Sequence, residues 1–99
     1  MSNAIFSRVT DDSFSVSGEL QMGTVMAVLS DFTRNIPSDS SIRIDFSGVT
    51  NSDSAAVALI IGWLAKAKKV NTHIQLVGLP QQILDIAKAC DLLEILPID

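Results

Sequence analysis

The distribution of apolar and polar positions near the start of the chain predicts a β-hairpin. In residues 5–9 and 14–17, apolar positions partly alternate with polar ones, which is the pattern of strands with one buried face. Asp11 and Asp12 lie between the two segments and are residues that favour turns. We expect Gly18 to end the second strand.

The next segment has the spacing of an amphipathic helix. Between residues 21 and 35, apolar residues recur at intervals of three and four, which places them along one helical face. These residues are Met22, Val25, Met26, Leu29 and Phe32. Pro37 and the serine and aspartate residues after it end the helix.

The second half of the chain alternates between strand and helix patterns. Residues 42–46 alternate as a strand, and a polar loop over 47–54 leads into an apolar segment over 55–70. That segment is too long for a strand, and a helix so apolar must be covered by a sheet and by something else. Residues 74–77 are a further strand, and Pro80 suits the first turn of another helix.

The order of the predicted elements defines the fold class. The last helix has an apolar stripe formed by Ile83, Ile86, Ala87 and Cys90. Residues 92–98 follow as an apolar tail, expected to be an edge strand or a docked coil. The resulting order, ββαβαβα plus a tail, predicts one α/β domain over residues 1–99. Its sheet should be mixed but mostly parallel, with an N-terminal hairpin and helices packed on it.

Composition narrows the classes of function. The 99 residues are 47% hydrophobic and 18% charged, with a formal net charge of −4, so the chain is too apolar to be disordered. Acidic domains repel phosphate backbones and anionic lipids, which argues against nucleic-acid binding. The apolar run over 55–65 is too short to span a bilayer. The first residues lack the apolar region of a secretion signal, so we expect a cytoplasmic protein.

Residues that carry catalysis or bind cofactors are sparse. His73 is the only histidine, and we interpret it as a surface residue because no Ser-His-Asp spacing supports it. Cys90 is the only cysteine, cannot form an internal disulfide, and is expected to be a buried small hydrophobe. No Walker A or GxGxxG motif occurs. We therefore expect no cofactor, no metal and no enzymatic activity.

Two groups of charged residues leave alternatives open. Lys66, Lys68 and Lys69 suit the C-terminus of a helix, where cations complement the dipole, although a phosphate-binding patch would use the same residues. Asp45 and Asp53 lie eight residues apart. They could bind a cation or act as an acid–base pair, but such residues more often cap a helix and hold a loop.

The junction before the apolar helix is the most informative segment. Ser52 or Asp53 can accept from the unpaired N–H groups that begin the helix. Ser54 would then stand at the first turn with its hydroxyl facing outward, and Ala55 and Ala56 leave the backbone uncovered. Such a flat surface with oriented donors favours docking of another protein over enclosure of a small molecule.

The same residues carry a family resemblance. The run Ile44-Asp45-Phe46-Ser47-x-Val49, followed by Asp53-Ser54-Ala55-Ala56 and an apolar helix, resembles the signature of STAS domains. The step Ser17-Gly18-Glu19-Leu20 is similar to the Gly-x-Leu-Asp step after the second strand of that family. The predicted element order agrees over nearly the whole chain.

Two branches of the family imply different partners. Asp53-Ser54-Ala55-Ala56 is similar to the motif of the MlaB-like subunit of phospholipid ABC transporters, although Gln21 replaces a usual aspartate and alanines replace glycines. Members of that branch bind the transporter's ATPase. In anti-sigma-factor antagonists, a kinase phosphorylates the serine two positions after the motif aspartate. Here that position is Ala55, which has no hydroxyl.

The resemblance therefore implies an accessory subunit that binds the ATPase of a phospholipid transporter at the inner membrane. The expected contact surface comprises Asn51, Asp53, Ser54, Ala55 and Val57. The alternative is a regulatory module of the anti-sigma-factor-antagonist type. The apolar helix could also support a homodimer of the isolated domain.

Overall fold

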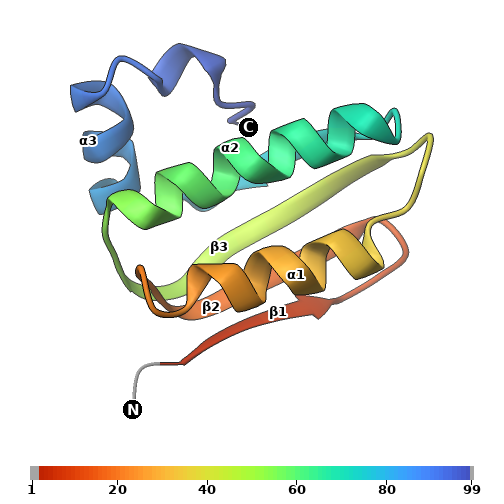
Figure 1. The fold of residues 1–99 in the computed structure, drawn as a ribbon, viewed down its shortest axis with the longest axis horizontal. Coiled ribbons are helices and arrows are strands. Elements are labelled where there is room, and N and C mark those ends of the chain that lie inside the picture. The colour runs from red at the N-terminus through yellow and green to blue at the C-terminus, as the bar shows by residue number, and fades with distance from the viewer. Residues whose placement is uncertain (1–2, 99) are drawn as a thin grey trace.

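A computed structural model describes residues 3–98, which form a mixed four-stranded sheet with helices packed on it (Figure 1). The strands lie in the order β1-β2-β3-β4. The elements are β1 (Ala4–Arg8), β2 (Ser13–Leu20), α1 (Val25–Asn35), β3 (Ser41–Ser52), α2 (Ser54–Lys69), β4 (His73–Val77), α3 (Gln81–Ala89) and a 3-10 turn, η1 (Leu93–Ile95). The predicted α/β class, hairpin and element order are confirmed.

The sheet is antiparallel at one edge and parallel elsewhere. β1 pairs with β2 in antiparallel register, whereas β2–β3 and β3–β4 are parallel. α1 and α2 lie side by side over one face, and both begin at the end of the sheet where β2 and β3 finish (Figure 1). This arrangement brings two helix N-termini to the same end of the molecule.

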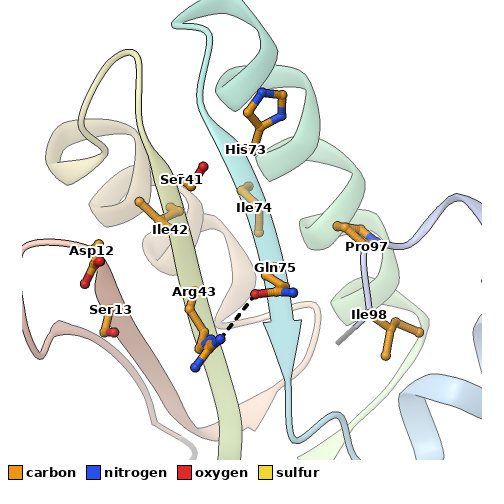
Figure 2. A pocket seen from close by; sticks show the side chains of 10 residues that line it. All are labelled: Asp12, Ser13, Ser41, Ile42, Arg43, His73, Ile74, Gln75, Pro97 and Ile98. Carbon is orange, nitrogen blue, oxygen red and sulfur yellow. Dashed lines mark hydrogen bonds between the residues drawn. The ribbon is translucent and has the colours of Figure 1, made fainter.

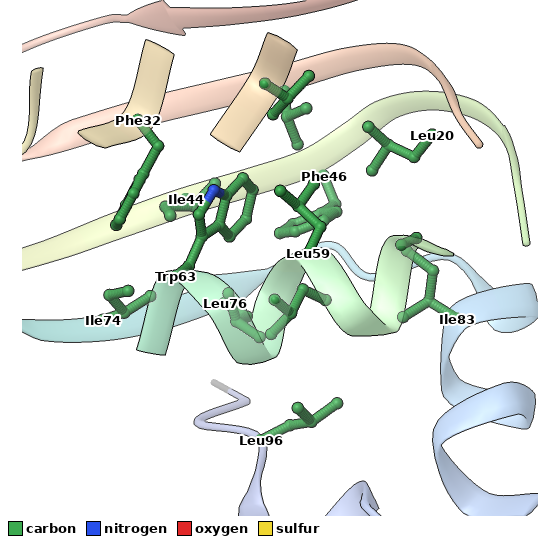
Figure 3. Packing of buried hydrophobic residues seen from close by; sticks show 14 of the residues in the cluster. Leu20, Phe32, Ile44, Phe46, Leu59, Trp63, Ile74, Leu76, Ile83 and Leu96 are labelled. Atoms are coloured by element: carbon green, nitrogen blue, oxygen red, sulfur yellow. The ribbon is translucent and has the colours of Figure 1, made fainter. Parts of the chain in front are cut away.

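The core lies between this helical layer and the sheet. All five aromatic residues of the chain are packed there, and Trp63 of α2 occupies the centre (Figure 3). Its ring centroid lies 5.3 Å from that of Phe32, 5.6 Å from that of Phe46 and 5.9 Å from that of Phe6. The apolar segment that forms α2 is therefore covered by the sheet on one side and by α1 beside it, as its composition required.

The opposite face of the sheet is open and polar. Alternate residues of β3 and β4 point away from the helices, so Arg43, His73 and Gln75 are exposed. The Arg43 guanidinium donates a hydrogen bond of 3.4 Å to the Gln75 side chain, which lies on the neighbouring strand (Figure 2). The expected surface position of His73 is confirmed.

Helix α1 begins at Val25 and not at residue 21. Residues 21–24 form a turn in which the Thr24 hydroxyl accepts from the Gln21 N–H at 3.0 Å and donates to the Glu19 carbonyl at 2.6 Å. Met22 precedes the helix, and Met22 and Met26 are 80% and 70% exposed. Placing these two methionines on the same apolar face as Phe32 was therefore wrong.

Two strands are longer than the sequence pattern predicted. β2 continues through Gly18 to Leu20, because Gly18 adopts a φ of +89° and the pairing with β3 shifts register at that point. A Cβ atom at Gly18 would lie 1.9 Å from the carbonyl oxygen of Asn3, so only glycine fits there. β3 correspondingly runs to Ser52, and most of the predicted polar loop is strand.

The C-terminal part of the chain docks against the edge of the sheet. Leu96 is buried, and the N–H of Leu76 donates to the carbonyl of Pro97 at 2.8 Å, beside a parallel bridge from Leu76 to Ile98. The expectation of a docked tail is confirmed. Cys90, in contrast, is exposed after the end of α3, so its predicted burial was wrong. Over residues 3–98, no helix has the length and apolar character needed to cross a membrane.

Candidate partner-binding site at the junction of β3 and α2

The junction consists of the end of β3, the single residue Asp53 and the first turn of α2. Parallel pairing with β2 holds the strand end, because Leu20 pairs with Ser52 and the Leu20 carbonyl accepts from the Asp53 N–H at 3.2 Å. The sheet therefore fixes the position and direction in which the backbone enters α2.

Asp53 is the N-cap of α2. Its backbone is extended, and its Oδ1 atom accepts from the N–H of Ala55 at 2.8 Å. This contact satisfies one of the donors that every helix N-terminus leaves unpaired. Of the two cap residues that the sequence allowed, Asp53 is therefore the one used, and Ser52 points elsewhere.

Ser52 belongs to a polar cluster that ties the junction to α3. The Ser52 N–H donates to Asn51 Oδ1 at 3.0 Å and to Gln82 Oε1 at 3.2 Å, and Gln82 Nε2 donates to Asn51 Oδ1 at 3.3 Å. Ser52 itself is 7% exposed. Because Gln82 is some thirty residues away in the chain, no local pattern could have identified it. The cluster immobilises the strand end beside the cap.

The structure separates the expected contact residues into two groups. Asn51, Asp53 and Ser54 are exposed and Ala55 is half-buried, so these four lie on one accessible surface. Val57 is 4% exposed and packs in the core, so including it in the contact surface was wrong. It belongs to the buried face of α2 together with Ala56 and Ile60. Ser54 is exposed, and its hydroxyl has no hydrogen-bond partner within the described chain.

The possible acid–base pair does not form a shared site. Asp53 caps α2, whereas Asp45 Oδ1 accepts from the Ser47 N–H at 2.9 Å and stabilises its own strand locally. Among residues 3–98, no three His, Cys, Asp or Glu side chains come together in a group that could hold a metal ion. Each carboxylate therefore has a local structural role.

A shallow hollow lies away from the junction, on the open face of the sheet where β2, β3 and β4 begin (Figure 2). Its volume is about 730 Å³, and polar side chains such as Ser13, Ser41 and Arg43 line it. Sites that enclose small molecules are usually deeper and more apolar. It does not join the junction residues.

The capping contact of Asp53 should contribute to the stability of the folded domain. Replacing Asp53 by alanine removes the acceptor for the Ala55 N–H and should lower the free energy of unfolding by about 0.5–2 kcal/mol. Asp53→Asn keeps a capping oxygen and should retain most of that stability. Urea unfolding followed by circular dichroism measures both variants. Equal stability of Asp53→Ala and the natural sequence would show that the cap contributes nothing.

Comparison with known proteins identifies the family to which this two-layer α/β domain belongs. A family model described as "Mlab, STAS domain" matches residues 7–97. The chain therefore belongs to the STAS-domain family, which consists of protein-interaction modules. No curated protein matches the sequence significantly.

Two of the solved structures that match this chain are anti-sigma factor antagonists with the same fold. One is the anti-sigma factor antagonist SpoIIAA in its unphosphorylated form, with a TM-score of 0.71 and 16% identity over 97% of this chain and 87% of that chain. The other is an anti-sigma factor antagonist from Mycobacterium paratuberculosis, with a TM-score of 0.73 and 19% identity over 96% of this chain and 82% of that chain. At these identities the likeness concerns the fold.

Proposed function

We propose that this STAS domain is a non-enzymatic accessory subunit that binds the ATPase of a phospholipid-transporting ABC transporter. The contact surface would be Asn51, Asp53, Ser54 and Ala55. The exposed Ser54 beside a fixed cap is the observation that carries the proposal. The match to a family model named for MlaB supports the choice of partner. The domain would be cytoplasmic and reach the inner membrane through the ATPase.

The hydrogen bonds of the junction would favour binding of the partner by keeping the contact surface rigid. The Asp53 cap and the Asn51–Gln82 contact hold the surface in one conformation before a partner arrives, which reduces the entropy lost on binding. An accessory subunit without chemistry can influence an ATPase only by binding one of its conformations more tightly than another. The expected consequence is a more stable or more active ATPase.

Co-expression tests this function directly. The ATPase of the host's phospholipid transporter should co-purify with the domain in stoichiometric amount, and its thermal unfolding temperature should rise in the complex. An ATPase of an unrelated transporter from the same host is the matched control. Failure to co-purify with the phospholipid ATPase, or equal retention of both, would refute the proposed partner.

The second candidate is an anti-sigma-factor antagonist, which the two similar structures favour. The residue at the position phosphorylated in that branch is Ala55, but the neighbouring Ser54 is exposed and carries a hydroxyl. Incubation with an anti-sigma-factor kinase of the host and ATP, followed by intact-mass measurement, distinguishes the two functions. We expect no gain in mass. A gain of one phosphate that is lost in Ser54→Ala would support the antagonist instead.

A further inference from the structure

Strand β1 forms one edge of the sheet. Among residues 3–98 it is the outermost strand and pairs only with β2, in a register that runs without a bulge from Ala4 to Arg8 (Figure 1). The opposite edge differs, because the C-terminal tail pairs there with Leu76 of β4. Sheet edges are usually protected from pairing with other chains by proline, bulges or projecting charges. β1 has neither a proline nor a bulge.

The backbone of β1 directs hydrogen-bonding groups outward. The Val9 N–H donates to the Ser13 carbonyl at 2.8 Å, and at the other end of the strand the Glu19 N–H donates to the Asn3 carbonyl at 3.0 Å. In an antiparallel pair such bonds recur at every second residue, so the odd-numbered residues direct their backbone groups toward β2. The even-numbered residues of β1 direct theirs away from β2, toward the outer edge: Ala4, Phe6 and Arg8.

The one charged side chain of β1 does not protect this edge. The Arg8 guanidinium donates to the carbonyls of Thr10 and Asp11 in the hairpin turn, at 3.3 and 3.0 Å. It also lies 5.6 Å from the ring centroid of Phe14. Phe14 is the residue of β2 that pairs with Arg8. The side chain therefore leans inward over the sheet and does not project past the outer strand.

Two exposed hydrophobic side chains accompany the edge. Ile5 is 54% exposed, and Val9, which directly follows β1, is 64% exposed. Because side chains alternate along a strand, both lie on the face opposite Phe6, whose ring packs on Trp63 beneath the helices. Ser7 lies midway between them and is exposed too. The exposed face of this strand is therefore apolar at both ends and symmetric about Ser7.

This symmetry makes the edge complementary to itself. Two antiparallel copies can pair only in registers that differ by steps of two residues, because outward backbone groups must meet each other. The register centred on Ser7 places Ile5 of each copy directly opposite Val9 of the other. A register centred on Phe6 would place Ile5 opposite Ser7. A register centred on Arg8 would bring two like charges together, which is destabilising.

We propose that β1 pairs with β1 of a second copy of this chain, antiparallel and centred on Ser7, so that the two sheets become one continuous sheet. Twofold-symmetric contacts use the same surface on both copies, and main-chain hydrogen bonds along a sheet edge supply affinity. The paired strands are only about 17 Å long, and so short an edge buries less than the roughly 1,200 Å² of a stable interface. The dimer should therefore be weak, with a dissociation constant on the order of 0.1 mM.

Cysteine cross-linking tests the register. In the proposed dimer the Cα atoms of the two Ser7 residues lie about 4.5 Å apart, within the range of about 4.4–6.8 Å for a disulfide. Ser7→Cys, made with Cys90→Ser because Cys90 is exposed, should form a disulfide-linked dimer under mild oxidation at about 0.2 mM. Ser41→Cys with Cys90→Ser is the matched control, since Ser41 is exposed at the start of β3, and should stay monomeric. Equal cross-linking of the two variants, or none in either, would overturn the proposal.

Sedimentation equilibrium at concentrations up to about 1 mM measures the association itself. Ile5→Lys and Val9→Glu should each weaken it about tenfold, because a charge then faces an apolar side chain. Both changes in one chain should restore it, since the introduced lysine of each copy faces the introduced glutamate of the other. All three variants should keep the urea midpoint of the natural sequence, because both positions are exposed. A monomeric natural sequence, single variants that associate normally, or a double variant no better than the single ones would overturn the proposal.

Self-association through β1 is independent of the proposed function. Ser54 follows β3, and β2 separates that strand from β1. Ser54→Arg should therefore lose the transporter ATPase and keep its self-association, whereas Ile5→Lys should do the reverse. Loss of self-association in Ser54→Arg would place the dimer contact at the junction and overturn the pairing of β1. Retention of the ATPase by Ser54→Arg would reject the proposed function and leave the pairing of β1 supported by its own tests.

Discussion

Replacing Trp63 by alanine should lower the free energy of unfolding by about 3–5 kcal/mol, the usual cost of removing a large buried aromatic side chain. Trp63 is fully buried and its ring packs against Phe6 of β1, Phe32 of α1 and Phe46 of β3, so it joins α2 to three other elements at once. Small domains have total stabilities of about 5–15 kcal/mol. The variant should therefore be close to unfolding at physiological temperature.

Trp63→Phe is the matched control for this prediction. It keeps an aromatic ring in the cluster and removes the indole N–H, which is buried and has no hydrogen-bond partner within the described chain. An unpaired buried donor costs about 1–3 kcal/mol, so its removal offsets part of the lost packing. Urea unfolding followed by far-ultraviolet circular dichroism compares the variants without relying on tryptophan fluorescence. A loss below about 1 kcal/mol in Trp63→Ala would contradict the central role of Trp63 in the core.

Ser54→Arg should produce the largest effect on binding. Its hydroxyl is exposed at the first position of α2, and an arginine there would occupy the space that the partner must approach. Disrupting the centre of an interface costs about 2–4 kcal/mol, which corresponds to a loss of affinity of about 30-fold to 1,000-fold. Isothermal titration of the transporter ATPase measures this loss.

Stability must be separated from binding in that experiment. A cation at a helix N-terminus opposes the dipole, but the cost is about 0.3–1 kcal/mol, so Ser54→Arg should remain folded. Ser41→Arg introduces the same side chain at an exposed position on the far end of β3 and should bind the ATPase like the natural sequence. Equal affinity of both variants would show that Ser54 is outside the interface.

The hydrophobic pattern was sufficient to predict the layers of this fold. A strand buried on one face alternates apolar and polar residues, as β3 and β4 do. A helix buried on most sides is a long apolar segment, as α2 is. Both patterns can be recognised in the sequence. The start of α1 was not predictable in the same way. The helical spacing extends back to Met22, but the Thr24 hydroxyl bonds hold residues 21–24 in a turn. Met26 lies within the helix and is exposed all the same.

At the candidate site too, contacts between neighbouring residues could be predicted from the sequence, whereas contacts between distant residues could not. Capping by Asp53 follows from a local contact and was one of two alternatives that the sequence allowed. The burial of Ser52 depends on Gln82, and the burial of Val57 depends on how α2 meets the sheet. Such contacts between distant residues leave no signal in a single sequence.

Amide hydrogen exchange of the domain, alone and bound to the transporter ATPase, tests the proposed contact most directly. The amides of residues 53–56 begin α2, and those of residues 9–12 lie in the hairpin turn at the far end of the sheet. Slower exchange at 53–56 in the complex, with no change at 9–12, is the result expected when the strand–helix junction receives the ATPase. Protection confined to the far end, with residues 53–56 exchanging as they do in the isolated domain, would contradict it.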